Sequence, residues 1–182
     1  ALVSLTIPPS MTIADCQQIY EGLLALADEY EVAIAGGDFT VAEGPLSLSV
    51  TLAGTPSPSG NWLRRGALAG DAILVTGTLG GSILGHHMTF SPRLHVARRI
   101  SEEWEVHAAT DISDGLLRDL ANIARASGLA AHLELDAIPI SPAASQLSRE
   151  TGLPPLQHAL SDGEDFELLL AVAGDQASRM LA

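Results

Sequence analysis

The stretch from Thr110 to Leu117, which reads TDISDGLL, gathers oxygen-bearing side chains in one short segment. Asp111, Ser113 and Asp114 place two carboxylates and a hydroxyl within four positions. Such oxygens are suitable ligands for a hard cation such as Mg²⁺. If a helix begins at this point, its free N–H groups also favour an anion such as a phosphate. The stretch therefore predicts magnesium bound beside a nucleotide.

A helix is predicted directly after this stretch, with Ser113 or Asp114 as its N-cap and Gly128 just past its end. Its apolar residues recur at the spacing of one helical face: Leu116, Leu117, Leu120, Ile123 and Ala124. A second interpretation is open, in which one polar residue caps the helix and the others are solvated. Because one cap needs a single acceptor, the second carboxylate favours the metal site.

Two glycine-rich stretches are weaker candidates for a ligand site. Gly36-Gly37-Asp38 follows an apolar run, so its glycines would admit a ligand and Asp38 would reach a cation. An ordinary tight turn is the favoured alternative there. Residues 77–82 would cradle a phosphate through backbone N–H groups, although they lack the Gly-Lys-Ser/Thr ending of a P-loop.

Other charged residues have a default interpretation as solvated surface. Residues 161–167, SDGEDFE, hold four carboxylates, and a solvated loop is expected unless one of them binds a cationic substrate group. Arg64 and Arg65 are candidate phosphate contacts in an acid-rich chain. His86 and His87 are expected at the surface, because no third ligand stands at the spacing of a metal site.

Composition narrows the class of protein. The chain has 182 residues, of which 47% are apolar, enough for a real core. With 9 Lys+Arg against 22 Asp+Glu, the net charge of −13 argues against a nucleic-acid partner, and any polyphosphate would have to be handled through bound metal. A single cysteine, Cys16, fits a reducing cytoplasm, and the apolar runs are too short to span a membrane.

The elements that position these residues alternate between strands and helices. We expect strands at residues 2–7, 32–35 and 46–52, the last two paired with each other, and a helix at 13–30. Residues 55–60, rich in Pro, Ser and Gly, mark a boundary between domains 1–58 and 59–182.

The part after the boundary repeats this alternation. We expect helices from about residue 82, at 93–103, after the DISDG stretch and at 143–151, and strands at 72–76, 106–110, 131–135 and 166–172. Such alternation predicts an α/β (α+β) architecture.

Four segments together resemble the thiamine-monophosphate kinases, and their order and intervals also match that family. The segments are GGD at Gly36, RRGALAGDAILVTGTLGG from Arg64, HAATDISDGLLRDL from His107 and ALSDGEDFELL from Ala159. DISDGL and GEDFEL are specific to that family, whereas the glycine-rich strand and turn is shared with aminoimidazole ribonucleotide synthetase and selenophosphate synthetase. The similarity covers nearly the whole chain and weakens between residues 86 and 106.

The resemblance implies a two-domain aminoimidazole ribonucleotide synthetase-like fold. It also implies a cytoplasmic homodimer that uses Mg²⁺ and ATP to phosphorylate thiamine monophosphate to thiamine diphosphate. Residues 1–58 would be the C-terminal part of a dimerisation and ATP-binding domain, and residues 59–182 the C-terminal α/β domain.

Carried over residue by residue, the resemblance makes Asp38, Asp111 and Asp114 magnesium ligands and Glu164 a contact to the thiamine moiety. Nucleotide contacts would come from Tyr20, Gly37, Asp38, Arg64 and Ser113. No side chain is assigned as nucleophile or base, since the acceptor phosphate, with a second pKa of about 6, is largely dianionic at neutral pH.

Members of the family carry further magnesium-binding aspartates near the N-terminus and an aromatic substrate contact near the C-terminus. We expect both outside these 182 residues, so that this stretch alone has impaired catalysis. Two alternatives are another ATP-dependent kinase or synthetase of the same superfamily, and a fragment that binds nucleotide or dimerises without turnover.

Overall fold

The computed structural model describes residues 1–57 and 59–181. The chain forms two compact units, Ala1–Pro56 (unit 1) and Ser57–Ala182 (unit 2). The division falls within the stretch expected as a boundary, and Pro58, the last residue of the first expected domain, lies outside the described residues. In the described part of the chain, no helix combines the length and the apolar character needed to cross a membrane.

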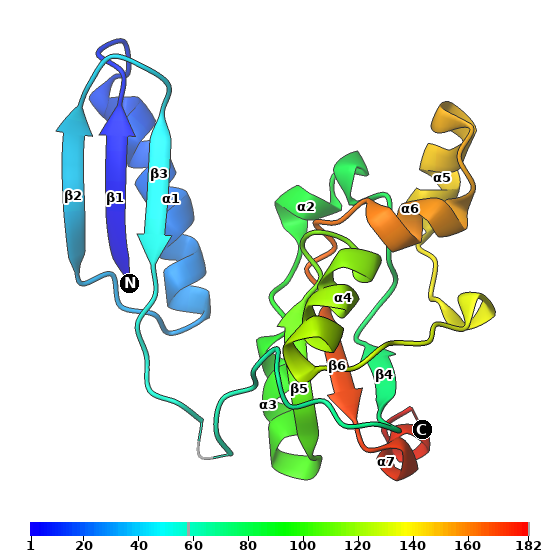
Figure 1. The fold of residues 1–182 in the computed structure, drawn as a ribbon. Coiled ribbons are helices and arrows are strands. Elements are labelled where there is room, and N and C mark those ends of the chain that lie inside the picture. The colour runs from blue at the N-terminus through cyan, green and yellow to red at the C-terminus, as the bar shows by residue number, and fades with distance from the viewer. Residues whose placement is uncertain (58, 182) are drawn as a thin grey trace. The chain divides into compact units, whose positions relative to one another are not determined.

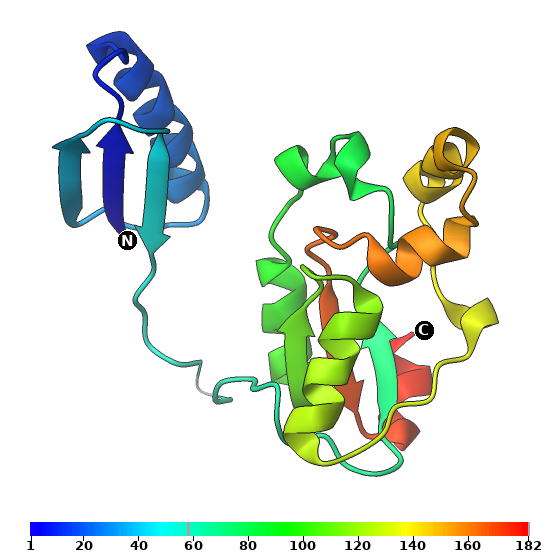
Figure 2. The same ribbon diagram turned by 45° about the horizontal axis from the view of Figure 1, so that its top comes forward.

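Unit 1 is a three-stranded sheet with one helix. It contains β1 (Leu2–Ile7), α1 (Ile13–Glu29), β2 (Gly36–Val41) and β3 (Ser47–Thr51). The strand order is β2-β1-β3, with β1 parallel to β2 and antiparallel to β3 (Figure 1). Val3, Leu5 and Ile7 alternate along β1 and are buried, as expected for the face that α1 covers (Figure 2).

Two expectations for unit 1 are wrong. Residues 32–35 form no strand, because the N–H of Val32 bonds to the carbonyl of Ala27 at 2.8 Å and so continues the end of α1. The strand begins instead at Gly36, and it does not pair with β3, since β1 lies between them. Gly37 belongs to this parallel pairing: a Cβ there would overlap the backbone carbonyl of Val3, so glycine is required by the sheet itself.

Unit 2 is built on a second three-stranded sheet, of order β4-β6-β5. Its strands are β4 (Ala72–Val75), β5 (Val106–Asp111) and β6 (Leu168–Val172). Both β4 and β5 run antiparallel to β6, with Val75 opposite Leu169 and Asp111 opposite Leu168. The carboxyl ends of β4 and β5 and the amino end of β6 therefore meet at one end of the sheet.

Helices cover both faces of this sheet. Leu169 and Ala171 of β6 pack in one cluster with residues of α4, whereas Leu170 and Val172 pack on the other face with residues of α3 and α7. This three-layer arrangement confirms the predicted α/β class. The helical segments are η1 (Ser82–Leu84), α2 (His86–Thr89), α3 (Leu94–Glu103), α4 (Leu116–Ser127), η2 (Leu135–Ala137), α5 (Pro142–Thr151), α6 (Pro155–Ser161) and α7 (Gly174–Met180).

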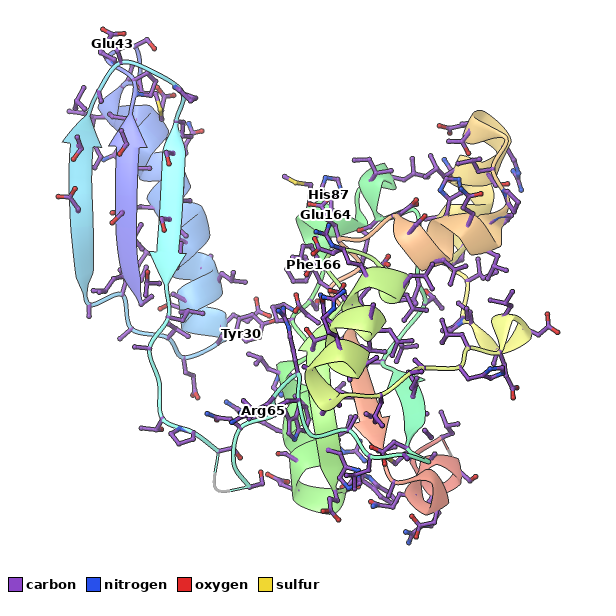
Figure 3. The ribbon with its side chains drawn as sticks, viewed as in Figure 1. Tyr30, Glu43, Arg65, His87, Glu164 and Phe166 are labelled. Carbon is purple, nitrogen blue, oxygen red and sulfur yellow. The ribbon has the colours of Figure 1, made fainter. Side chains whose placement is uncertain are left out.

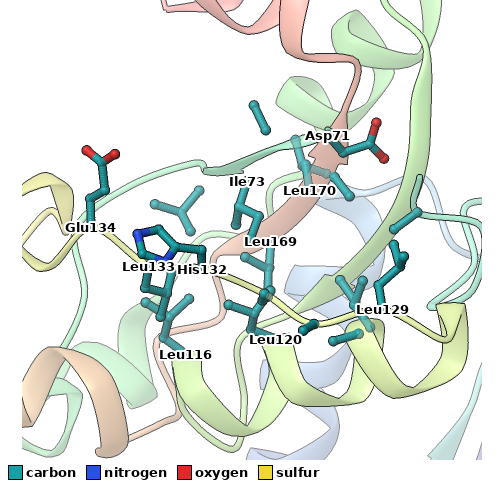
Figure 4. A pocket seen from close by; sticks show the side chains of 18 of the residues that line it. Asp71, Ile73, Leu116, Leu120, Leu129, His132, Leu133, Glu134, Leu169 and Leu170 are labelled. Carbon is teal, nitrogen blue, oxygen red and sulfur yellow. The ribbon is translucent and has the colours of Figure 1, made fainter. Parts of the chain in front are cut away.

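The prediction of a strand at residues 131–135 is wrong. The alternation of Ala131 and Leu133 with His132 and Glu134 is typical of a strand, but the segment is irregular and ends in η2. It lines a largely apolar cavity of about 600 Å³ between β4, β6 and α4 (Figure 4). The nearest ladder contact is an isolated parallel bridge between Leu79 and Ile140, so pairing begins only after this segment.

Candidate active site

Three loops lie at the end of the unit 2 sheet where β4 and β5 finish and β6 begins. We call them the glycine turn (residues 77–82, after β4), the aspartate loop (residues 111–115, after β5) and the acidic loop (residues 161–167, before β6). The sequence separates them widely, and the antiparallel pairing of β6 with both neighbours brings them together.

The acidic loop lies directly against the aspartate loop. The N–H of Glu164 donates to the carbonyl of Ser113 at 2.8 Å, and the N–H of Phe166 donates to the carbonyl of Ile112 at 2.9 Å. Gly163 makes this approach possible, since it has a φ of +77° and a Cβ there would lie 2.5 Å from the Ser113 carbonyl oxygen. Ser113 and Glu164, predicted as separate contacts to nucleotide and substrate, are thus neighbours.

The aspartate loop is held by a residue that the sequence analysis missed. Oδ2 of Asp119 accepts the N–H groups of Ser113 and Asp114, each at 3.0 Å, and the Asp119 side chain is buried. The predicted N-cap is wrong, because Gly115 occupies that position and α4 begins at Leu116. An acidic residue in the first turn of a predicted helix was the available signal for Asp119.

This arrangement leaves the predicted metal ligands at the surface. Asp111 ends β5 as an exposed residue, and the side chain of Asp114 is half exposed, with Oδ2 3.5 Å from Nε of Arg118. Since Asp119 caps the loop, the carboxylates of Asp111 and Asp114 are available to a ligand. Arg64 lies close by, donating from Nε to Oγ1 of Thr110 at 3.2 Å.

Two carboxylates of the acidic loop point into the protein, so the expected solvated loop is wrong for them. Asp165 is 3% exposed and Glu167 is 2% exposed. Arg93 binds both carboxylate oxygens of Glu167, with Nε 2.7 Å from Oε2, and the hydroxyl of Thr76 donates to Oε2 at 2.6 Å. Burial would raise the pKa of Glu167, but these hydrogen bonds and the positive charge of Arg93 hold it below its ordinary value.

Asp165 has a different environment. Its Oδ1 accepts the N–H of Gly80 at 2.8 Å, and its buried Oδ2 has no hydrogen-bond partner among the described residues. Burial raises the pKa of Asp165 to about 6, and the neighbouring carboxylates of Asp162 and Glu167 act in the same direction. Arg93 forms its ion pair with Glu167 and not with Asp165. This difference explains why the pKa values of two buried acids in one loop shift in opposite directions.

Two backbone N–H groups of the glycine turn donate hydrogen bonds to carboxylates of the acidic loop. The N–H of Gly80 bonds to Asp165, and the N–H of Gly81 donates to Oδ2 of Asp162 at 3.0 Å. Asp162 also contacts Nδ1 of the buried His158 at 2.9 Å. Two donors expected to cradle a phosphate are therefore engaged within the protein.

Unlike the buried acids, Glu164 faces solvent, and Phe166 is only partly buried. Glu164 is exposed with a φ of +54°, and Phe166 has a φ of +52°. The ring of Phe166 stacks on Phe90, with centroids 4.2 Å apart. Figure 3 shows Glu164 and Phe166 at the same end of unit 2, together with His87, whose Nδ1 lies 2.8 Å from the carbonyl oxygen of Ser82.

The remaining predicted residues belong to unit 1. Tyr20 lies on α1 and is partly buried, whereas Gly37 and Asp38 lie in β2. Oδ2 of Asp38 accepts the hydroxyl of Thr40 at 3.0 Å. Within unit 2, the structure brings together Arg64, Asp111, Ser113, Asp114 and Glu164 at one end of the sheet. Among residues 1–57 and 59–181, no three His, Cys, Asp or Glu side chains are grouped closely enough to hold a metal ion.

Comparison with known proteins gives consistent matches. Residues 85–182 match the family described as AIR synthase related protein, C-terminal domain. The sequence is 48% identical to a thiamine-monophosphate kinase of Rhodopirellula baltica over 98% of this chain and 56% of that protein. The chain is also similar to the crystal structure of the thiamine-monophosphate kinase from Stenotrophomonas maltophilia, with a TM-score of 0.77 and 31% identity. That match covers 99% of this chain and 63% of the Stenotrophomonas chain.

A further structure, AaThiL complexed with AMPPCP and TMP, has the same fold. Its TM-score is 0.76 at 24% identity, and the match covers 96% of this chain and 62% of that chain. This chain thus spans between about half and two thirds of the length of these relatives.

Proposed function

This chain belongs to the family of AIR synthase related proteins, and we propose that the intact protein is a kinase that transfers the γ-phosphoryl group of ATP to thiamine monophosphate, giving thiamine diphosphate. The observation that carries the proposal is the 48% identity to a protein named thiamine-monophosphate kinase, over 98% of this chain. The adjacency of the aspartate loop and the acidic loop, which hold the motifs specific to those enzymes, supports it.

We assign magnesium binding in unit 2 to Asp111 and Asp114. Their chemistry fits the ion, since Mg²⁺ is commonly held by one or two carboxylates together with phosphate oxygens and water. Both side chains reach the surface, and Asp119 satisfies the backbone of the loop without them. Magnesium bound there would neutralise phosphate charge and stabilise the charge that develops during phosphoryl transfer. Asp38 of unit 1 is assigned as a further ligand on the resemblance alone.

The nucleotide is assigned to Arg64 and Ser113 in unit 2 and to Tyr20, Gly37 and Asp38 in unit 1. Arg64 uses one donor on Thr110, and the guanidinium has further N–H groups for a phosphate. Ser113 contributes a hydroxyl beside the two carboxylates. AaThiL was solved with AMPPCP, a nucleotide analogue, which supports ATP as the phosphoryl donor here.

Glu164 is assigned to the thiamine moiety of the acceptor. Its carboxylate is exposed next to the aspartate loop, as a contact to a cationic ring requires. The acceptor phosphate needs no strong base, because its second pKa of about 6 leaves it largely dianionic at neutral pH. The protein's task is therefore to orient two phosphate groups and to offset their repulsion.

We also propose a cytoplasmic homodimer, on the resemblance to the thiamine-monophosphate kinases. Sedimentation equilibrium of the intact protein tests the dimer, and a single monomeric species at micromolar concentration would reject it.

A direct assay tests the function. Intact protein supplied with ATP, Mg²⁺ and thiamine monophosphate is expected to form thiamine diphosphate and ADP in equal amounts. Thiamine and aminoimidazole ribonucleotide precursors are the control acceptors and are expected to give no product. Product from a control acceptor, with none from thiamine monophosphate, would assign the protein to another branch of the family.

A further inference from the structure

Glu164 is exposed to solvent, and the backbone around it has a conformation that surrounding contacts must stabilise. Both Glu164 and Phe166 have positive φ values, +54° and +52°, in the region that residues other than glycine seldom occupy. Such conformations persist only where surrounding contacts over-determine them. The main chain of Glu164 is bonded on both sides, by its N–H to Ser113 and by its carbonyl, which accepts the hydroxyl of Ser82 at 2.6 Å.

The acidic residues of this loop do not all face solvent. Asp165 and Glu167 point inward, each nearly fully buried, and Glu164 points outward. The two buried carboxylates accept hydrogen bonds from other segments: Asp165 from the N–H of Gly80, and Glu167 from Arg93 and Thr76. The loop is therefore held from inside by its own acidic residues.

The contact between Arg93 and Glu167 is the most specific of these anchors. It joins residues 74 positions apart, and the guanidinium engages both carboxylate oxygens. Such a planar two-point contact fixes orientation as well as distance, which a lysine ammonium would not do. The same segment supplies Phe90, whose ring stacks on Phe166. Two contacts from residues 90–93 therefore fix the acidic loop just after Glu164, at Phe166 and Glu167.

We infer that Arg93 and Glu167 are positioning residues for the acceptor: their ion pair holds the acidic loop so that Glu164 meets the cationic ring of the acceptor beside the aspartate loop. This inference rests on the proposed function. It assigns neither residue a contact with substrate. Because the aspartate loop is held separately, by Asp119, loss of the pair is expected to weaken acceptor binding and to spare nucleotide binding.

Steady-state kinetics of the intact protein with ATP and thiamine monophosphate tests this inference. Glu167→Gln and Arg93→Lys are each expected to raise KM for thiamine monophosphate by roughly tenfold or more, the scale of loss that misplacement of a binding group produces. KM for ATP is expected to stay within about twofold of wild type. Arg93→Lys preserves the positive charge, so it gives a folded variant if Glu167→Gln fails to fold.

A matched control separates positioning from general destabilisation. Asp71→Asn disturbs another, partly buried contact of unit 2, in which both Asp71 oxygens lie 2.9 Å from Nδ1 of His107 at the other end of β5. It is expected to lower the melting temperature while leaving KM for thiamine monophosphate unchanged. An unchanged acceptor KM in Glu167→Gln and Arg93→Lys, beside an active wild type, overturns the positioning role alone. A wild type that does not turn over thiamine monophosphate overturns the proposed function, and the positioning role with it.

Discussion

Oδ2 of Asp119 accepts the backbone N–H of Ser113 at 3.0 Å, so that a buried carboxylate on the first turn of α4 shapes the loop before it. It binds the N–H of Asp114 in the same way. This arrangement frees the side chains of the aspartate loop from capping, which is the condition under which they can serve a metal and a nucleotide.

Replacement of Asp119 by alanine is expected to damage both stability and nucleotide binding. Two backbone N–H groups lose their acceptor, at a cost of about 1–3 kcal/mol each if they are not rehydrated. Chemical denaturation measures the stability, and calorimetric titration of intact protein with a non-hydrolysable ATP analogue and Mg²⁺ measures the affinity. Asp136→Ala, an exposed aspartate on η2, is the control. Equal nucleotide affinity in both variants would show that Asp119 does not organise the loop.

The paired substitution Asp111→Asn with Asp114→Asn tests the metal assignment. Both changes keep the size of the side chain and remove its charge, so the fold is expected to be retained. The dependence of nucleotide-analogue affinity on Mg²⁺ is expected to fall by at least about tenfold, because the hard anionic ligands are lost. Magnesium-dependent affinity equal to that of wild type would reject the site.

Asp165 is expected to make stability depend on pH. Its pKa of about 6 in the folded protein lies above the ordinary value of 3.8, so the native state holds this proton more tightly than the unfolded chain. The stabilisation is fully present below pH 3.8 and is lost as the pH rises through about 6, by on the order of 3 kcal/mol.

Asp165→Asn isolates this effect. The amide oxygen still accepts the N–H of Gly80, and the titrating proton is gone. The difference in free energy of unfolding between Asp165→Asn and wild type is expected to grow in favour of the variant from pH 4 to pH 7. Glu167, whose pKa is lowered, loses its contribution only below its ordinary value of 4.5 and does so in both proteins. A difference that stays constant across this range contradicts the assignment.

Removal of Arg93 is expected to cost more than removal of the whole ion pair. Arg93→Met leaves the carboxylate of Glu167 buried without its cation, and a loss of about 3 kcal/mol is expected, at the lower end for buried pairs because the Arg93 side chain is 31% exposed. The double variant Arg93→Met with Glu167→Met is expected to recover most of this loss. Additive losses in urea denaturation would show that the two residues are energetically independent.

Gly37→Ala is expected to weaken the sheet of unit 1. A Cβ at this position overlaps the carbonyl of Val3, so β2 must move away from β1, at a cost above about 2 kcal/mol. Gly22→Ala on α1 is the control, since a Cβ there meets nothing within 4 Å and helix propensity rises. Amide hydrogen exchange of β1 and β2 reports the effect locally. Equal protection in the two variants would contradict the close approach.

Sequence pattern was sufficient for elements with a clear apolar periodicity. The helix at Leu116–Ser127 shows a clear apolar face and ends at Gly128, and the strand at Ser47–Thr51 alternates cleanly. Residues 131–135 show the same kind of alternation, but the strand predicted there is absent, because pairing with a neighbour decides whether such a segment becomes a strand. The glycines at 36–37 suggest a turn, whereas they begin β2, and Gly37 is needed there for the close approach to β1.

The candidate site could be located from the sequence only in part. Asp111, Ser113 and Asp114 were recognisable because they are contiguous, and Glu164 because it lies in a family motif. Partners that come from distant segments left no local pattern. Arg93 and Glu167 are 74 residues apart, and the acidic composition of residues 161–167 favours a solvated loop until the fold supplies a cation.

The central claim is that this protein passes the γ-phosphoryl group of ATP directly to thiamine monophosphate. The most direct measurement follows the label from γ-³²P ATP in the intact protein with Mg²⁺ and thiamine monophosphate. The account predicts that labelled thiamine diphosphate forms with one label per ADP released, and that Asp111→Asn with Asp114→Asn abolishes it. ADP formation with the label in inorganic phosphate alone, or with thiamine monophosphate left unchanged, would contradict the account.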